Sequence, residues 1–180
     1  LTILVVTISM AVTPLLYLSA EQISFGRPME VPDEMLDDNE HPVIIAGFGR
    51  FGQIIGRMLR AKRIGFTALE LDPNQVNFVA KYGNKVYYGD STRFDVMSAA
   101  GAGDATVLLL AIDDAAHSVK TAELVRERFP NLTIIARAKD RSHAHQLMEQ
   151  GVTHVIRETF HSGIEAGKLT FQSIGFPEKE

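Results

Sequence analysis

A glycine-rich run that directly follows an apolar segment restricts the fold of this chain more than any other feature. The run is Gly47, Phe48, Gly49, Arg50, Phe51 and Gly52, and it separates Val43–Ala46 from a stretch with helical spacing. A strand, a G-x-G-x-x-G turn and a helix in this order surround a bound phosphate with backbone N–H groups. We therefore predict that residues 47–52 bind the phosphate of a nucleotide.

The glycines of this run have separate expected roles. Gly47 permits the tight bend, Gly49 lets the backbone approach a phosphate, and Gly52 lets the helix lie close to the strand. The helix N-terminus adds free N–H groups and a partial positive charge. A single G-x-G-x-x-G motif is weak evidence, so the prediction also depends on the acidic residues that follow it.

Beyond Pro42, apolar runs alternate with segments of helical period. Six runs are predicted as strands: Val43–Ala46, Phe66–Leu71, Lys85–Tyr88, Thr106–Ile112, Leu132–Ala136 and His154–Ile156. The clearest helical stripe consists of Phe51, Ile54, Ile55, Met58 and Leu59. Strands that alternate with helices predict a parallel sheet with right-handed crossovers. The expected fold class is α/β, a Rossmann-like doubly wound parallel six-stranded sheet over residues 42–157.

Helix boundaries are marked by residues with special backbone preferences. Asp72 is expected to cap a helix that begins at Pro73, and Pro130 to stop the longest helix. Left-handed C-terminal caps are expected at Gly65, Gly83, Gly101 and Gly151. Helical spacing returns after Glu158, so residues 158–180 are predicted as a C-terminal helix and a candidate dimer crossover.

The amino terminus differs in composition from the rest. Residues 1–20 carry no charge, and twenty such residues are just long enough to cross a bilayer. We expect them to be the end of a transmembrane helix rather than a buried element of a soluble domain. Residues 21–41 are rich in Asp, Glu and Pro and are predicted as an acidic linker.

Glu70 lies eighteen residues after Gly52, at the end of the second predicted strand. A carboxylate at this place bonds ribose hydroxyls and repels a 2′-phosphate, which favours adenosine nucleotides or NAD(H) over NADP(H). The alternative is a solvated acid at a strand end. Asp72, two residues later, is expected to act only as a helix cap.

Further acidic and hydroxyl groups follow the third and fourth predicted strands. Asp90 and Ser91 come after the third, and Asp90 is a candidate acceptor for an adenine amino group or a ribose. The alternative is an aspartate that only shapes the turn. Asp113 ends the fourth strand and is expected near the phosphate turn, whereas Asp114 is expected to cap the next helix.

Composition excludes several classes of function. The net charge of −4 argues against nucleic-acid binding, and the lack of cysteine excludes disulfides and thiolate metal sites. The six histidines show no spacing typical of metal ligands, so no metal site is expected. The chain also offers no separate region for a substrate and its proton donor. We therefore expect no catalytic residues and a nucleotide that is sensed rather than converted.

Five segments of the chain carry a resemblance to a known family. These segments are His41–Arg57, Lys85–Arg93, Ala111–Asp114, Ile135–Ala138 and Arg157–Phe160. Together they closely resemble the cytosolic regulatory (RCK or KTN) domain of the Kef glutathione-gated potassium efflux systems of Gram-negative bacteria. The resemblance covers about residues 42–176, and the apolar start resembles the end of that family's antiporter membrane domain.

The resemblance implies a regulatory domain that binds AMP or NAD(H) in the glycine-rich crevice and forms a homodimer. It implies that glutathione near the dimer interface keeps transport closed, and that glutathione conjugates open potassium efflux coupled to proton entry. The implied location is the bacterial inner membrane, with this domain on the cytoplasmic side and the antiporter domain in the same chain. An ancillary subunit similar to quinone oxidoreductases is also implied.

Three residues match the glutathione-contacting positions of that family. They are Arg57, Arg157 and Tyr82, the last usually Phe in the family. The guanidinium groups suit the two carboxylates of glutathione. From the residues alone, a solvated surface charge is the more common role for either arginine, and Tyr82 is equally consistent with core packing.

Two other functions are compatible with the same sequence. One is the cofactor-binding half of an NAD-dependent oxidoreductase, and the other is the nucleotide-sensing subunit of a potassium uptake system. The sequence also leaves open whether AMP, NAD+ or NADH is the bound nucleotide.

Overall fold

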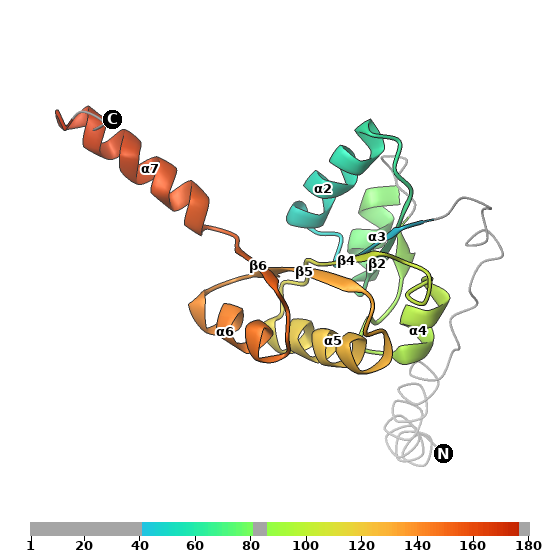
Figure 1. Ribbon diagram of the computed structural model, residues 1–180. Coiled ribbons are helices and arrows are strands. Elements are labelled where there is room, and N and C mark those ends of the chain that lie inside the picture. Colours follow the sequence, from blue (N-terminus) through green and yellow to red (C-terminus); the bar gives the residue numbers. More distant parts are fainter. Residues whose placement is uncertain (1–40, 81–85, 177–180) are drawn as a thin grey trace, which may run out of the picture. The chain divides into compact units, whose positions relative to one another are not determined.

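The computed structural model describes residues 41–80 and 86–176, and its centre is a six-stranded sheet with the strand order β3-β2-β1-β4-β5-β6 (Figure 1). The predicted membrane segment, the acidic linker up to residue 40, Tyr82 and Gly83 lie outside the described residues. Within the part described, no helix has both the length and the apolar character needed to span a bilayer.

All strand pairs are parallel, as predicted. The strands are β1 (Val43–Ala46), β2 (Phe66–Glu70), β3 (Tyr87–Tyr88), β4 (Val107–Leu110), β5 (Thr133–Ala138) and β6 (His154–Arg157). β1 pairs with β2 on one side and β4 on the other, so the chain changes its winding direction between β1 and β4. In open α/β sheets, ligands bind in the crevice beyond the carboxyl ends of the strands at this switch point.

Helices cover both faces of the sheet. They are α2 (Arg50–Ala61), α3 (Pro73–Ala80), α4 (Phe94–Ala99), α5 (Ala115–Arg128), α6 (Arg141–Glu149) and α7 (Phe160–Ser173). Figure 1 shows α2 on one face and both α5 and α6 on the other. This is the doubly wound arrangement that right-handed crossovers produce when the winding direction reverses.

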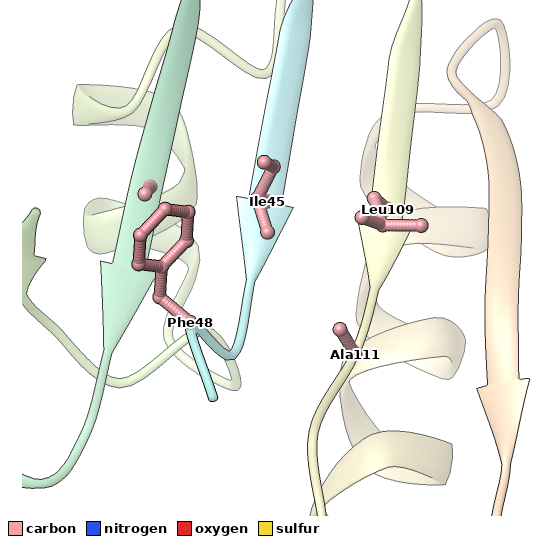
Figure 2. Close-up of a cluster of buried hydrophobic side chains, with 5 residues drawn as sticks. Ile45, Phe48, Leu109 and Ala111 are labelled. Atoms are coloured by element: carbon pink, nitrogen blue, oxygen red, sulfur yellow. The ribbon is translucent and has the colours of Figure 1, made fainter. Parts of the chain in front are cut away.

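A cluster of buried side chains joins the glycine-rich turn to the sheet (Figure 2). Ile45, Ala68 and Leu109 lie on one face of three neighbouring strands, because side chains alternate between faces along a strand. Phe48 and Ala111, just beyond the strand ends, complete the cluster. Only 1% of the Phe48 side chain is exposed, and its burial contributes about 2 kcal/mol.

The buried face of α2 differs from the predicted stripe. Ile54 and Met58 are exposed by 57% and 64%, whereas Gly52 and Gly56 are fully buried. A Cβ atom at Gly52 would lie 2.4 Å from the Gly47 carbonyl oxygen, so the helix approaches the strand through its glycines. The predicted helix is present, and its apolar stripe leaves Ile54 and Met58 exposed because periodicity locates a stripe but not the close contact at the glycines.

The helix ends mostly follow the prediction. Asp72 Oδ1 accepts a hydrogen bond from Asn74 N at 2.9 Å, and α3 begins at Pro73. Gly101 and Gly151 have φ values of +87° and +75°, as expected of C-terminal caps. The cap predicted at Gly65 was wrong, because α2 ends at Ala61 and the left-handed residue is Arg63, with φ +58°. α5 ends at Arg128, two residues before Pro130.

The C-terminal helix α7 was predicted from the spacing of apolar residues and spans Phe160–Ser173. None of the residues of this helix is buried. Four of its apolar side chains and one that follows it are exposed by 44–65%: Phe160, Ile164, Leu169, Phe171 and Ile174. The helix therefore presents apolar surface that this chain's described residues do not cover.

Candidate functional site

A cleft of about 380 Å³ opens at the carboxyl ends of β1, β2 and β4. Its lining includes Gly47, Gly49, Glu70, Ser91, Asp113 and His117. The first five of these were predicted as site residues from the sequence. The cleft thus lies at the switch point between β1 and β4, where the topology favours ligand binding.

Two of the predicted glycines are required by the protein itself. Gly47 has φ +88°, and a Cβ atom there would lie 2.8 Å from the Ala111 carbonyl carbon. Its N–H donates to the Leu69 carbonyl oxygen at 2.9 Å, which fixes the turn against β2. Gly52 is packed against the same turn. Any larger residue at either position would displace backbone, which is costly.

Gly49 is different, because nothing in the described structure requires a glycine there. It has an ordinary φ of −70°, and a Cβ atom built on it would have no heavy atom within 4 Å. Gly49 lines the cleft and is the N-cap of α2, where no described side chain caps the helix. The open space next to free backbone N–H groups has the geometry that a phosphate needs.

The other residues of the glycine-rich run have different surroundings. The Phe48 side chain is part of the core, and Phe48 is not among the described residues that line the cleft. Arg50 is exposed at the first position of α2, and Phe51 is half-buried. The Phe51 ring centroid lies 5.9 Å from the Arg137 guanidinium carbon. These residues shape the turn, and the contribution of Arg50 to ligand binding stays a prediction.

Glu70 ties the glycine-rich turn to the end of β2. Its Oε2 accepts a hydrogen bond from Phe48 N at 2.8 Å, and its Oε1 accepts from Leu71 N at 2.9 Å and Asp72 N at 3.1 Å. A carboxylate has about four acceptor sites, so one is left for a ribose hydroxyl. The carboxylate therefore positions the turn in addition to its predicted ribose contact.

Asp90 holds three hydrogen bonds on a single oxygen. Its Oδ1 accepts from Thr92 N at 2.9 Å, from Thr92 Oγ1 at 2.7 Å and from His117 Nε2 at 3.0 Å. Burial raises the pKa of this carboxyl, but the bonds from Thr92 and the nearby His117 lower the pKa by more, so it lies below its usual range. Asp90 therefore shapes its turn. It is not among the described residues that line the cleft, so its contact with a ligand stays a prediction.

Ser91 and His117 lie next to this carboxylate. Ser91 is buried, and its Oγ lies 3.1 Å from Thr121 Oγ1, so its side chain is bonded to α5. His117 lines the cleft from the first turn of α5, where its backbone N donates to Asp114 Oδ1 at 2.8 Å. Sequence reasoning predicted the Asp114 cap but missed His117. The Asp114 cap could have identified it, because a cap residue places the residue three positions later in the first turn of the helix, and that residue is His117.

Asp113 lies at the rim of the cleft and forms an ion pair with Arg137 of β5. The same guanidinium donates to the Ile112 carbonyl oxygen at 3.1 Å and lies 3.2 Å from Glu158 Oε2. Only 5% of the Arg137 side chain is exposed. Sequence reasoning did not single out Arg137, because its partners are more than twenty residues away along the chain.

The residues assigned to glutathione by resemblance lie in separate places. Arg57 is exposed on α2, and Arg157 is half-buried at the end of β6, with its guanidinium carbon 3.9 Å from the Phe160 ring centroid. β4 and β5 separate β6 from β1. The described residues of one chain therefore do not bring the two guanidinium groups together, and Tyr82 lies outside them.

Comparison with known proteins establishes the family. The profile of the TrkA-N domain matches residues 43–158, from the start of β1 to the residue after β6. The chain belongs to the TrkA-N domain family. The TrkA-N domain assignment agrees with the predicted Rossmann-like fold.

The resemblance to the Kef systems is also confirmed. The chain is 43% identical over 173 residues to the glutathione-regulated potassium-efflux system protein KefC of Escherichia coli. The match covers 96% of this chain and 28% of that relative, so the chain spans under a third of its length.

Two solved structures are similar to this TrkA-N domain. One is the Kef CTD of Shewanella denitrificans in its AMP-bound form, with 44% identity, a TM-score of 0.66 and coverage of 74% of this chain and 80% of that one. The other is the TrkA-N domain of the inner membrane protein ybaL from Escherichia coli, with 23% identity and a TM-score of 0.66. It covers 73% of this chain and 98% of that one, and it supports the fold alone.

Proposed function

We propose that this chain is the ligand-gating regulatory domain of a glutathione-regulated potassium/proton antiporter, and that it binds AMP or NAD(H) in the cleft. One observation carries the proposal: the open space at Gly49, beside the uncapped N-terminus of α2. The 44% identity to a Kef CTD determined with AMP bound supports the adenosine nucleotide. A phosphate at Gly49 places the ribose within reach of Glu70.

The charges around the cleft disfavour a nucleotide that carries an additional phosphate on its adenosine ribose. No Lys or Arg is among the described residues that line the cleft. Four carboxylates do line it: Glu70, Asp72, Asp113 and Asp114. A 2′-phosphate next to Glu70 would bring like charges together in a partly desolvated place. NADP(H) is therefore expected to bind much more weakly than NAD(H).

The nucleotide is held and not converted. A dehydrogenase needs a proton donor beside the nicotinamide, and the histidine of this cleft, His117, is instead bonded to Asp90. The curated relatives are named as potassium-efflux proteins. If the purified chain transferred hydride between NAD(H) and an electron acceptor, the oxidoreductase alternative would replace this proposal.

Glutathione is the second proposed ligand, and Arg57, Arg157 and Tyr82 are its proposed contacts. Because Arg57 and Arg157 stem from separate parts of one chain, the proposed site lies at the interface of a homodimer. The exposed apolar residues of α7 supply a surface for the second copy. Gating then requires that glutathione and its conjugates bind the closed and open states with different affinity.

The proposed setting follows from the relatives. The antiporter domain belongs to the same chain, upstream of the acidic linker, in the bacterial inner membrane. The TrkA-N domain lies on the cytoplasmic side, and an ancillary subunit similar to quinone oxidoreductases is a further proposed partner. These assignments rest on the similarity to KefC.

Two measurements test the function. Mass spectrometry of the purified chain should identify an adenosine nucleotide that copurifies. Calorimetry should then detect glutathione binding, with at least about tenfold weaker affinity for Arg57→Ala and for Arg157→Ala because each loses a charge-assisted contact. Arg141→Ala is the matched control, since Arg141 is an exposed arginine on α6. Equal glutathione affinity in all four proteins would remove both arginines from the site.

A further inference from the structure

Arg137 occupies an unusual place for a charged residue. It lies in β5, between β4 and the edge strand β6, with 5% of its side chain exposed. A buried guanidinium is costly unless charged or polar groups surround it. Its partners come from two separate segments: Ile112 and Asp113 precede α5 at the cleft, and Glu158 follows β6. Its Nε is buried without a partner among the described residues.

The two carboxylates differ in their surroundings. The Asp113 side chain is 87% exposed and lines the cleft, so a ligand there has direct access to it. The Glu158 side chain is 32% exposed and is not part of the cleft lining. Its backbone N donates to the Ala138 carbonyl oxygen at 3.1 Å, which holds it next to β5. One guanidinium therefore bridges the cleft and a residue outside it.

Glu158 also marks the start of another element. It directly follows Arg157 and precedes Thr159, the N-cap of α7. A shift of Glu158 relative to Arg137 therefore moves the junction between β6 and α7. Arg157, the last residue of β6, directly precedes this junction. The two carboxylates share one positive charge, so a change at one of them alters the interaction of the other.

We propose that Arg137 is a positioning residue that couples occupancy of the nucleotide cleft to Glu158 and the β6–α7 junction. A nucleotide hydroxyl that donates to Asp113 weakens the bond between Asp113 and Arg137. The guanidinium then redistributes its interaction toward Glu158. This inference rests on the proposed function, because it requires a nucleotide in the cleft.

Coupling between two sites is reciprocal, which makes the proposal testable from the remote end. Glu158→Gln removes a negative charge that neutralises Arg137 and leaves the cleft untouched. The guanidinium then lacks the acceptor that receives it when the nucleotide engages Asp113, so it stays paired with Asp113 and the nucleotide competes less well for that carboxylate. We expect AMP to bind at least about fivefold more weakly, at the lower limit of typical coupling between sites.

The experiment is calorimetry of AMP binding to the purified chain at about 0.1 M and about 0.5 M salt. Glu165→Gln on α7 is the matched control, since it removes an exposed carboxylate whose nearest cation is Lys168 at 3.9 Å. The Glu158→Gln effect should persist at high salt, because a buried contact is screened little. The effect should also disappear when Arg137 is replaced by Met or by Gln, whichever variant folds, because neither carries a charge.

The outcomes separate the inference from the proposed function. A chain that binds neither AMP nor NAD(H) overturns the proposed function. A chain that binds AMP with the same affinity as its Glu158→Gln variant overturns the coupling alone. Hydrogen exchange of the unaltered chain gives a second readout, in which AMP must change the protection of the amides of residues 158–163. Unchanged protection there also overturns the coupling.

Discussion

His117 donates through Nε2 to Asp90 Oδ1 across 3.0 Å, and this bond joins the first turn of α5 to the loop after β3. The two residues belong to different crossovers of the doubly wound sheet and meet beside the cleft. Because Thr92 donates to the same oxygen, the carboxylate is held in one orientation. The contacts of Oδ1 are made within the protein, so they fix the direction of Oδ2 as well.

Replacing Asp90 by Asn should lower stability in a pH-dependent manner. The pKa of Asp90 is lowered in the folded state, so its contribution is present above about pH 3.9, the pKa of an unfolded aspartate, and is lost as pH falls through the folded pKa. Urea unfolding should show the variant destabilised by about 1 kcal/mol near pH 6 and much less near pH 3. Asp104→Asn, at an exposed aspartate, is the control. An equal difference at both pH values would contradict the assignment.

A second pH effect is expected from His143, which is buried in α6 with its Nε2 unpartnered among the described residues. Burial lowers the pKa of His143, and the positive charges of Arg137 and Lys139 lower it further. The carboxylates of Asp140 and Asp114 raise this pKa, but not enough to offset the burial. The unfolded chain therefore takes up more protons below about pH 6.5, and stability falls from there toward the folded pKa. His143→Gln should reduce the loss between about pH 7 and pH 5.5 by about 1 kcal/mol. His145→Gln, at an exposed histidine of the same helix, is the control and should leave the loss of stability between about pH 7 and pH 5.5 unchanged.

Gly47→Ala should destabilise the fold directly. A side chain at φ +88° costs about 1–2 kcal/mol, and its Cβ would collide with the Ala111 backbone. We expect a loss of at least about 2 kcal/mol in the free energy of unfolding, measured by urea unfolding without ligand. A Gly47→Ala variant as stable as the unaltered chain would mean that the turn has another conformation in solution.

Gly49→Ala should have the opposite pattern. Its Cβ meets no protein atom within 4 Å, so the stability of the ligand-free chain should fall by at most about 1 kcal/mol, the cost of Ala in place of Gly at the N-cap. The methyl group occupies the space assigned to the phosphate, and AMP affinity should fall by at least about tenfold, which corresponds to about 1.4 kcal/mol. Calorimetry of AMP binding checks this. Unimpaired binding would place the phosphate elsewhere.

Glu70→Gln should change which nucleotide is accepted. The amide keeps the length of the side chain but loses the negative charge and one acceptor oxygen, so NAD+ should bind several times more weakly. NADP+ should bind as well as before or more tightly, because the repulsion of its 2′-phosphate is removed. The ratio of the two dissociation constants is the measurement. An unchanged ratio would assign Glu70 to the turn alone, through its bond to Phe48.

Local patterns in the sequence predicted much of this fold. The alternation of apolar runs and helical segments located all six strands, and the glycine-rich turn after β1 located the cleft. The helix caps at Asp72 and Asp114 follow from short-range hydrogen bonds that a sequence displays directly. These features depend on residues only a few positions apart.

The missed features depend on contacts between distant parts of the chain. The bond from Phe48 N to Glu70 crosses 22 positions, and the bridge from Arg137 to Asp113 crosses 24. No periodicity encodes such pairs. The rotation of α2 was missed for the same reason, since it is set by the fit of Gly52 against the Gly47 carbonyl. Arg157 and Arg57 were identified by resemblance, and the described residues of one chain leave them apart.

Phe48 has a consequence for the thermodynamics of association. Its ring is anchored in the core while its N–H is held by Glu70, so contacts within the protein hold the loop around it in place. Under the proposed function, a nucleotide that binds there immobilises little backbone, and most of its interaction energy is retained as affinity. Such a receptor is suited to stay loaded at low cellular concentrations of its ligand.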